Sequence, residues 1–312
     1  MGKLRLLASL LCALPAWAAA GPLAYVPNEK SGSVSVIDTE SDTVIRTLAA
    51  GQRPRGVAIA ASGPLYVSDE GGRALLAVEP GGGEPPRSWP LGDSPEGVGI
   101  SADGKLLAAA VEKTNSIVLL EAETGVRRWE ARVAGKNPEH AVFSPDGRWI
   151  FVSAEEAEQV DVIDTASGRQ VASIPVGRRP RGIGFLPDGS RAYVACELDN
   201  AVHVIDVAER RTIARIAAGT FSNGIAVRPD GKRVFVSNGK DGTVMAIDTA
   251  THAVVGTTPV GKRPWNMAIT PDGRKLYVAN GRSNSVSVVD TESLARLKDI
   301  PVGDFPWGVA IR

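Results

Sequence analysis

The sequence predicts an all-β fold, a seven-bladed β-propeller with four antiparallel strands in each blade. Three observations predict it: an internal repeat, a hydrophobic period of two within each repeat, and turn residues at regular spacing. The repeat is examined first, because missing it would mis-assign the whole fold. Seven segments share a Gly-x-x-Pro-like start followed by a short apolar strand. They begin at Gly51, Gly92, Gly135, Gly177, Gly219, Gly261 and Gly303, with spacings of 41, 43, 42, 42, 42 and 42 residues.

Each repeat is predicted to form four short strands. In the repeat that begins at Gly261, apolar residues alternate with other residues over 265–270, 275–280, 285–290 and 297–302. A period of two is the signature of a β-strand. The turn Pro271-Asp272-Gly273 joins the first two segments, and its glycine can take the positive φ that a hairpin requires. Four-stranded units of this length are typical of propeller blades.

Aspartates recur at two places in the repeat. The turns after the first strand contain Asp103, Asp146, Asp188 and Asp230, and the third strands end at Asp38, Asp164, Asp206 and Asp248. A short acidic side chain accepts hydrogen bonds from the backbone of the turn that follows it. We therefore interpret these aspartates as turn residues and not as ligands of a bound group.

Both ends of the chain are predicted to complete one blade. The last repeat stops after its first strand, residues 308–312, while the segments LAYV, SVSVID and TVIRTL near the N-terminus supply three further strands. A ring closed in this way leaves no exposed sheet edge at the junction.

Residues 1–20 are predicted to be a signal peptide, so residues 21–312 form the single domain. Lys3 and Arg5 precede a short apolar run, and small residues follow it at 16–20. The protein is therefore expected in the periplasm or outside the cell. No apolar run reaches the roughly 20 residues that a membrane span needs. Removal of the leader leaves Cys196 as the one cysteine, which we interpret as a small buried hydrophobe.

Composition and motifs exclude several classes of function. Lys and Arg number 35 and Asp and Glu also 35, whereas a nucleic-acid binder needs a basic face. No esterase elbow, zinc-protease helix, haem-attachment motif, phosphate-binding loop or dinucleotide fingerprint is present. Only three histidines occur, which disfavours a multi-histidine haem or zinc site. We therefore assign no catalytic residue, no metal site and no cofactor, and we expect a monomer.

One mouth of the ring is predicted to gather unlike side chains. If the first strand of each blade runs away from this mouth, the loops before the first strand and after the second strand both open there. The loops after the second strands bring Glu29, Glu70, Glu112, Glu155 and Glu197. The candidate ligand-binding or partner-binding residues are Arg55, Glu96, Glu139, His140, Arg181, Phe221, Asn223, Trp265, Phe305 and Trp307. Aromatic rings beside alternating charges suit a planar, partly polar ligand or an anchoring loop of a partner.

A purely structural role explains the same residues equally well. The repeat-equivalent pairs Arg55 with Glu70 and Arg181 with Glu197 would then neutralise one another at a solvated rim, where ion pairs contribute only about 0 to 1 kcal/mol. The aromatic residues would form a hydrophobic plug in the channel, and His140 would be structural. Both interpretations remain open at this point.

The strands YVAN, YVSD and FVSN, the Pro-Asp-Gly turns and the Val-Ile-Asp-Thr strand ends resemble the YVTN-type β-propeller repeat proteins over essentially the whole mature chain. With its leader and the RPRG starts at Arg53 and Arg179, the chain is most similar to the propellers associated with PQQ-dependent alcohol catabolism. That resemblance implies an accessory role beside a periplasmic partner such as a quinoprotein dehydrogenase or a cytochrome. It implies association with PQQ only through this partner.

Three hypotheses of function follow. The first is an exported, non-enzymatic propeller whose funnel binds a protein or a small molecule. The second is a lactonase-like hydrolase in which Arg55, Arg181, Glu139, His140 and Asn223 orient a lactone carbonyl and a water, with or without a metal ion. The third is a structural scaffold or surface propeller.

Overall fold

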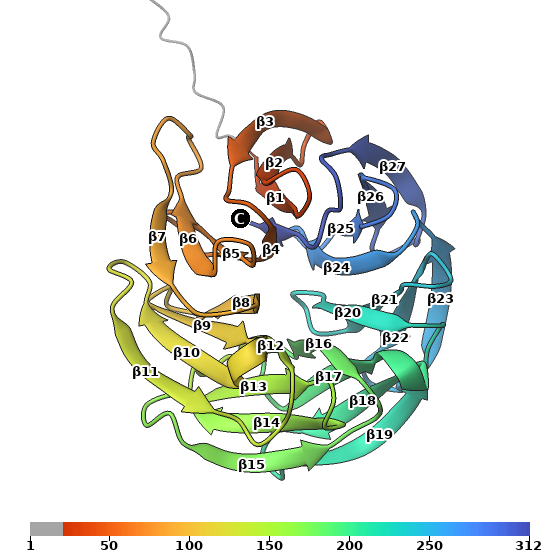
Figure 1. Ribbon diagram of the computed structural model, residues 1–312. Helices are drawn as coiled ribbons and strands as arrows, with labels where there is room; N and C mark the ends of the chain where they lie inside the picture. The colour runs from red at the N-terminus through yellow and green to blue at the C-terminus, as the bar shows by residue number, and fades with distance from the viewer. Residues whose placement is uncertain (1–20) are drawn as a thin grey trace, which may run out of the picture.

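The computed structural model describes residues 21–312; the predicted signal peptide lies outside the described residues. Within them, 28 strands form seven four-stranded antiparallel sheets arranged around a central axis (Figure 1). The predicted seven-bladed propeller is confirmed. We number the blades in the order of the repeats, so that blade I begins at Gly51 and blade VII contains both chain ends.

The strands of the first four blades have the following bounds. Blade I contains β4 (Pro54–Ile59), β5 (Leu65–Asp69), β6 (Ala74–Val78) and β7 (Arg87–Pro90). Blade II contains β8 (Pro95–Ile100), β9 (Leu106–Val111), β10 (Ser116–Glu121) and β11 (Arg127–Arg132). Blade III contains β12 (Pro138–Phe143), β13 (Trp149–Ala154), β14 (Gln159–Asp164) and β15 (Gln170–Pro175). Blade IV contains β16 (Pro180–Phe185), β17 (Arg191–Cys196), β18 (Ala201–Asp206) and β19 (Arg211–Ala217).

The remaining blades follow the same pattern. Blade V contains β20 (Ser222–Val227), β21 (Arg233–Asn238), β22 (Thr243–Asp248) and β23 (Val254–Pro259). Blade VI contains β24 (Pro264–Ile269), β25 (Lys275–Asn280), β26 (Ser285–Asp290) and β27 (Arg296–Pro301). Blade VII contains β28 (Ala310–Ile311), β1 (Leu23–Asn28), β2 (Ser33–Asp38) and β3 (Thr43–Ala49). Two short 3-10 helices, η1 (Glu112–Thr114) and η2 (Glu197–Asp199), follow β9 and β17.

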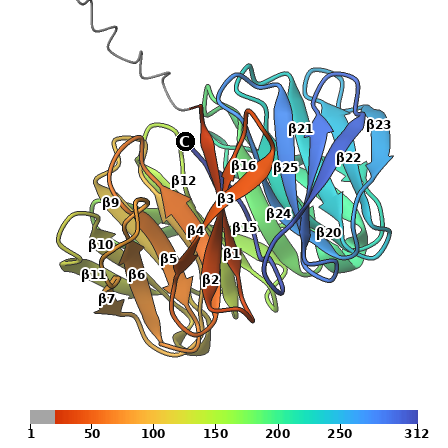
Figure 2. The same cartoon turned by 90° about the horizontal axis from the view of Figure 1, so that it is seen from above.

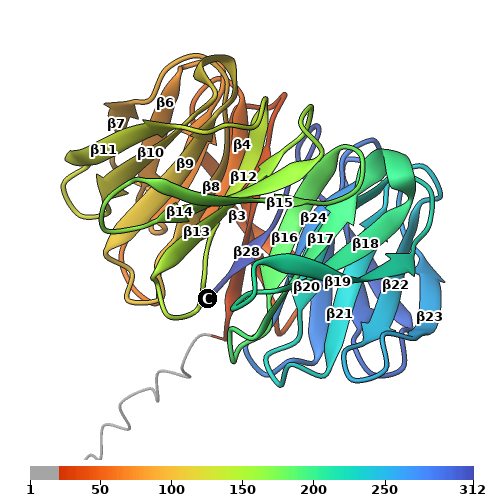
Figure 3. The same ribbon diagram turned by 90° about the horizontal axis from the view of Figure 1, so that it is seen from below.

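Blade VII is closed by both ends of the chain, as predicted. The C-terminal strand β28 pairs antiparallel with β1, with Tyr25 opposite Ala310. The Leu23 amide donates a hydrogen bond of 2.8 Å to the Arg312 carbonyl. Figures 2 and 3 show the start of the described chain beside the C-terminus. This inner strand has two residues where the inner strands of the other blades have six.

The hydrophobic core is divided among the seven blade interfaces. One cluster of buried apolar residues lies between each pair of neighbouring blades, with Tyr25, Phe151, Tyr193, Phe235 and Tyr277 among the largest buried side chains. Each sheet buries both of its faces against the neighbouring blades. Successive residues of a middle strand therefore belong alternately to the cluster on one side and to the cluster on the other. No helix of the described residues is long and apolar enough to cross a membrane.

Glycines let the inner strands converge on the axis. A Cβ atom on Gly56, Gly97, Gly182 or Gly224 would lie 2.4 to 2.7 Å from a carbonyl oxygen of the next blade. Real Cβ atoms do not approach so closely, so only glycine fits at these four positions. In blades III and VI the same position holds His140 and Asn266, whose larger side chains lie along the central channel.

The mouth opposite the candidate site consists of regular turns. Gly104, Gly147, Gly189, Gly231 and Gly273 take positive φ between 70° and 76°. The strand-ending aspartates accept local hydrogen bonds, as Asp248 does from the Thr251 amide at 2.8 Å. These bonds lower the pKa of Asp248. The interpretation of the aspartates as turn residues is confirmed.

Candidate functional site

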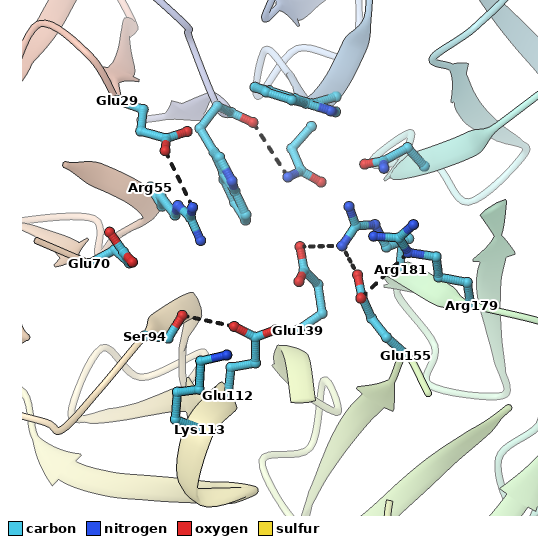
Figure 4. Close-up of a pocket in the computed structure, with 14 residues that line it drawn as sticks. Glu29, Arg55, Glu70, Ser94, Glu112, Lys113, Glu139, Glu155, Arg179 and Arg181 are labelled. Carbon is cyan, nitrogen blue, oxygen red and sulfur yellow. Dashed lines mark hydrogen bonds and ion pairs between the residues drawn. The ribbon is translucent and has the colours of Figure 1, made fainter. Parts of the chain in front are cut away.

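The loops before the inner strands and after the second strands surround a cavity of about 430 Å³, which we call the funnel (Figure 4). Its volume is in the range of sites for small molecules. The funnel is lined by Glu29, Arg55, Glu70, Ser94, Glu112, Lys113, Glu139, Glu155, Arg179, Arg181, Asn223, Trp265, Asn266 and Trp307.

The loop that enters each inner strand places its side chains through an unusual backbone conformation. Two residues after the repeat glycine, six blades carry a non-glycine residue in the left-handed region, with φ between 54° and 60°: Ser94, Asn137, Arg179, Phe221, Arg263 and Phe305. Such residues cost about 1 kcal/mol or more and persist only where the surroundings hold them. Here neighbouring blades hold them: the Phe221 amide donates to Asn200 Oδ1 at 2.9 Å, and the Phe305 amide donates to Asn284 Oδ1 at 3.1 Å.

Blades VII, I and II together form the first of two ion clusters. Arg55 Nη2 lies 3.3 Å from Glu29 Oε1, and Arg55 also pairs with Glu96. Arg53 Nη1 lies 2.5 Å from Glu70 Oε2, and Arg53 also pairs with Glu29. We call these five residues the Arg55 cluster. It contains two guanidinium groups and three carboxyl groups.

The second ion cluster joins blades III, IV and VI. Arg181 contacts three carboxyl groups: Glu139 at 3.0 Å, Glu197 at 3.3 Å and Glu155. Glu197 in turn contacts three guanidinium groups, and its side chain is only 2% exposed. We call Arg179, Arg181, Arg263, Glu139, Glu155 and Glu197 the Arg181 cluster. Figure 4 shows Arg55 and Arg181 on opposite sides of the funnel with Glu139 between them.

The pKa values of Glu96 and Glu139 are shifted in opposite directions. These residues occupy the same ring position in neighbouring blades. Burial, followed by the charge of Glu139, raises the pKa of Glu96 from 4.5 to about 8, because the opposing effect of Arg55 is smaller. Glu139 also loses solvation on burial, but Arg181 and then His140 outweigh this loss and lower its pKa. At neutral pH Glu96 is therefore mostly a neutral acid, whereas Glu139 is a carboxylate.

The Ser94 hydroxyl connects the buried Glu96 to the funnel. Ser94 Oγ lies 3.2 Å from Glu96 Oε1 and 2.8 Å from Glu112 Oε2. Ser94 Oγ is the donor in both contacts, so its single proton is shared between the two carboxyl groups. Glu96 Oε1 also accepts from Arg55. Ser94 and Glu112 line the funnel, whereas Glu96 is 3% exposed and lies behind them.

Aromatic and amide side chains from blades V to VII complete the wall. The Trp265 ring lies 5.8 Å from that of Phe305, and Lys30 Nζ lies 3.7 Å from the centre of the Phe305 ring. Below the funnel, a second cavity of about 160 Å³ follows the axis between the inner strands. Asn266 and Trp307 line both cavities and therefore separate them.

His140 belongs to the channel and not to the funnel. It lines the lower cavity, where its ring centre lies 5.5 Å from that of Trp307. Burial lowers the pKa of His140 to about 4, so its imidazole is neutral at neutral pH.

Of the ten candidate residues taken from the sequence, the structure places six on the funnel wall: Arg55, Glu139, Arg181, Asn223, Trp265 and Trp307. The other four lie around it: Glu96 behind the wall, His140 below it, and Phe221 and Phe305 at its rim. The predicted pairing of Arg181 with Glu197 is present, but that of Arg55 with Glu70 is wrong. Glu70 pairs with Arg53, because Arg55 points to Glu29 and to the next blade.

Sequence reasoning did not select Ser94, Lys113 or Arg263. Ser94 and Arg263 occupy the left-handed position of their repeats, and comparing that position across all seven repeats would have found them. Lys113 follows Glu112 in η1, at a position where the residue type varies between repeats, and it therefore gave no repeat signal. The interpretation of Cys196 is confirmed: it is fully buried, and burial raises its thiol pKa to about 12. Among residues 21–312, no group of three or more His, Cys, Asp or Glu side chains is arranged to hold a metal ion.

Fold and funnel together define a ring-shaped propeller with an ionisable, partly aromatic cavity at one mouth. The chain belongs to the family described as "Lactonase, 7-bladed beta-propeller", whose model matches residues 15–169 and 166–300. This match supports the propeller part of the resemblance noted in the sequence and gives no support to its YVTN-type and PQQ-linked part. No curated protein matches the chain.

Solved structures of several proteins share the fold. A functionally unknown protein from Desulfotomaculum acetoxidans is 18% identical with a TM-score of 0.80, over 93% of this chain and 98% of that one. Hydrazine synthase from Kuenenia stuttgartiensis is 23% identical with a TM-score of 0.78, over 86% and 92%. A candidate 6-phosphogluconolactonase from Bacteroides uniformis is 22% identical with a TM-score of 0.76, over 93% and 99%. At these identities the likeness concerns the fold alone.

Proposed function

We propose that the protein is a hydrolase that opens a sugar lactone in its funnel. Opening a lactone needs a base that activates water, a positive charge near the carbonyl oxygen and an acid that protonates the leaving ring oxygen. The funnel offers a group for each of these tasks. Membership of the lactonase propeller family supports the proposal, as does the fold shared with a candidate lactonase.

The observation that carries the proposal is a pair of neighbouring carboxyl groups at one ring position: Glu96 lies buried behind Ser94, and Glu139 lies on the funnel wall against Arg181. Their pKa values are shifted in opposite directions. Two neighbouring carboxyl groups with pKa values moved apart identify an acid and a base. Glu139 lines the funnel as a carboxylate and is the base that takes a proton from water. In the reaction, the Ser94 hydroxyl gives its proton to the ring oxygen and takes the proton that Glu96 holds at neutral pH.

The arginines stabilise the charge that develops on the carbonyl oxygen. Arg55 and Arg181 both line the funnel, and each is held in place by at least two carboxyl groups. Donors fixed before the reaction stabilise an oxyanion without a cost of reorganisation. In the overall step, water adds to the carbonyl carbon and the ring C–O bond breaks. The products are one carboxyl group and one alcohol, and no redox partner is involved.

A titration of acid release tests this proposal. The mature protein would be assayed at pH 7 against a panel of γ- and δ-lactones of sugars, with the uncatalysed rate subtracted. Glu139→Gln keeps the shape of the side chain and removes the base, so the rate is expected to fall by about 100-fold or more. Glu292→Gln, on the opposite mouth, is the matched control and is expected to keep the wild-type rate. A wild-type protein that opens no lactone faster than buffer does would refute the proposal.

A second candidate function is non-catalytic binding by an exported accessory protein. The rim of blades VI and VII favours it, because the tilted Trp265 and Phe305 rings and the ammonium group of Lys30 lie there in succession. Aromatic rings beside a charge are common anchors in protein interfaces. Capture of a purified periplasmic quinoprotein or cytochrome that is lost in Trp265→Ala with Trp307→Ala would support this function. Unchanged capture would reject the funnel as the contact.

A further inference from the structure

The funnel has nearly equal numbers of positive and negative groups. Counting the charged residues that line it and their direct ion-pair partners gives seven carboxyl groups, Glu29, Glu70, Glu96, Glu112, Glu139, Glu155 and Glu197, and six cationic groups, Arg53, Arg55, Lys113, Arg179, Arg181 and Arg263. Because Glu96 is mostly protonated at neutral pH, the remaining charges balance. All five arginines already contact carboxylates, so a ligand carrying its own negative charge would have to compete with these carboxylates.

Lys113 is the one cation on the funnel wall that forms no ion pair within residues 21–312. It is exposed on η1, directly after Glu112, and Figure 4 shows the two side chains next to each other. A single exposed ammonium group beside a carboxylate attracts anions weakly, because water screens it. The funnel as a whole therefore favours neither an anion nor a cation.

Asn223 is the amide on the funnel wall whose Nδ2 atom lacks a partner. In the part of the chain that the structure describes, the other buried wall atoms without a hydrogen bond are Arg55 Nε, Arg181 Nε and Glu155 Oε1, and they belong to the two ion clusters. Asn223 is 3% exposed, and its Nδ2 atom is buried without any hydrogen bond. A buried donor left unpaired costs about 1 to 3 kcal/mol, so natural proteins rarely retain one without a use for it. Asn266, the other amide on the wall, lies with Nδ2 3.5 Å from the Trp307 carbonyl and therefore has a partner.

The position of Asn223 in the ring explains why it is unpaired. Arg55 pairs with the residue at the same ring position of the next blade, which is Glu96. The corresponding neighbour of Arg181 is Asn223, and Arg181 turns instead to three carboxylates from its own blade and the preceding one. Blade V thus presents a neutral donor where blade II presents an acid. The indole rings of Trp265 and Trp307 occupy the same position in the next two blades.

From this arrangement we infer that the funnel binds an uncharged, polyhydroxylated ring and disfavours the same ring bearing a phosphate group. The Asn223 amide turns its buried Nδ2 atom toward the funnel and donates a hydrogen bond from it to an oxygen of the ligand. Trp265 and Trp307 contact the apolar edges of the ligand's ring. The inference rests on the proposed lactone hydrolysis for the chemistry of the ligand. It adds the charge class of the substrate and a residue that determines specificity.

Binding of a ligand that cannot be hydrolysed tests the inference separately from turnover. A gluconolactam, in which nitrogen replaces the ring oxygen, and its 6-phosphate ester would be titrated calorimetrically into the mature protein at pH 7. The lactam is expected to bind and to change the tryptophan fluorescence, and the phosphate ester to bind at least tenfold more weakly. Equal or tighter binding of the phosphate ester would overturn the charge argument.

The variant Asn223→Leu tests the role of the unpaired amide. It is expected to bind the lactam about tenfold more weakly, which is the effect of one lost hydrogen bond. Its melting temperature is expected to stay at or above that of the wild type, because an unsatisfied buried group has been removed. A purely structural asparagine would give the reverse: lower stability and unchanged binding. Asn223→Ala serves as a second variant if leucine prevents folding, and Glu292→Gln is the control.

The two proposals fail in different ways. A protein that binds the neutral lactam but opens no lactone would refute the proposed hydrolysis and leave this inference in place. A protein that opens only phosphorylated lactones would support the hydrolysis and refute this inference.

Discussion

The Arg55 and Arg181 clusters each contain the two arginines of an Arg-Pro-Arg-Gly segment, and they differ in their balance of charge. Each begins with Arg-Pro-Arg-Gly, at 53–56 in blade I and 179–182 in blade IV. In both, the second arginine contacts a glutamate from the preceding blade, Glu29 or Glu155. The Arg55 cluster contains two guanidinium groups for three carboxyl groups, whereas the Arg181 cluster contains three for three.

The Arg55 cluster has one guanidinium group fewer than the Arg181 cluster because of a difference at one ring position. Arg263 reaches Glu197 from two blades beyond blade IV. Two blades beyond blade I the same position holds Asn137, which donates to Glu156 at 2.7 Å. The Arg55 cluster therefore has one carboxyl group more than it has guanidinium groups. The raised pKa of Glu96 keeps a proton on that residue, which removes the extra negative charge. The comparison teaches that the repeat fixes where side chains meet, while single residues at equivalent positions decide which of them is protonated.

Removing the central arginine of each cluster tests the difference in charge balance. Arg181→Met leaves three buried carboxylates near one another, and breaking a buried ion pair in this way costs about 3 kcal/mol or more. Arg55→Met is expected to cost less, because Glu96 already carries a proton. Urea denaturation at pH 7 measures both free energies of unfolding. Equal losses in the two variants would contradict the comparison.

The pH dependence of stability distinguishes Glu96 from Glu139. Because the folded pKa of Glu96 is raised, the folded state holds more protons than the unfolded state between pH 4.5 and about 8, so stability falls as pH rises through this window. Glu96→Gln is expected to remove this fall and to gain on the order of 1 kcal/mol or more at pH 8. Glu139 has a lowered pKa, so its contribution is present above pH 4.5 and is lost on acidification.

The corresponding experiment is urea denaturation of the wild type, Glu96→Gln and Glu139→Gln at intervals from pH 4 to pH 9. The two variants are expected to differ from the wild type at opposite ends of this range. Two curves that shift in the same direction would show that the acid and base assignment is wrong.

The propeller fold was predictable from the sequence because every blade repeats the same pattern of strands and turns. The Gly-x-x-Pro starts, the Asp-Gly turns and the split last repeat each correspond to a local backbone requirement, and local requirements are visible in one sequence. The shared mouth also followed from strand direction alone. Six of the ten candidate residues accordingly line the funnel.

The chemistry of the funnel was less predictable, because it depends on which arginine reaches which carboxylate. The repeat places Arg55 and Glu70 at one mouth, but the Arg55 guanidinium group reaches Glu29 of blade VII and Glu96 of blade II instead. The same holds for His140. Its repeat position is next to Glu139, yet the strand turns its ring to the channel beneath Trp307. The alternation of residues along a strand determines on which face of the sheet a side chain lies. Which residue that side chain contacts depends on the neighbouring blades.

His140 provides a narrower test of the Arg181 side of the funnel. Its folded pKa of about 4 lies below its ordinary 6.5, so it stabilises the fold above pH 6.5 and this stability is lost as pH falls toward 4. His140→Asn introduces the residue that blade VI carries at the same ring position, Asn266. The variant is expected to lose less stability than the wild type between pH 6.5 and pH 4. If its loss equals that of the wild type, the acid sensitivity arises from the carboxylates.

The smallest effect is expected at the opposite mouth, where the same kind of contact occurs in solvent. Glu292 lies 2.6 Å from Arg228 and 2.8 Å from Arg233, so it bridges two guanidinium groups much as Glu197 does in the funnel. Its side chain, however, is 71% exposed, whereas that of Glu197 is 2% exposed. Water competes for an exposed pair and salt screens it, so such pairs add little to stability. Glu292→Gln is therefore expected to unfold at the same urea concentration as the wild type, and Glu197→Gln at a clearly lower one. Equal shifts in the two variants would mean that the number of arginine contacts, and not burial, determines the strength of these ion clusters.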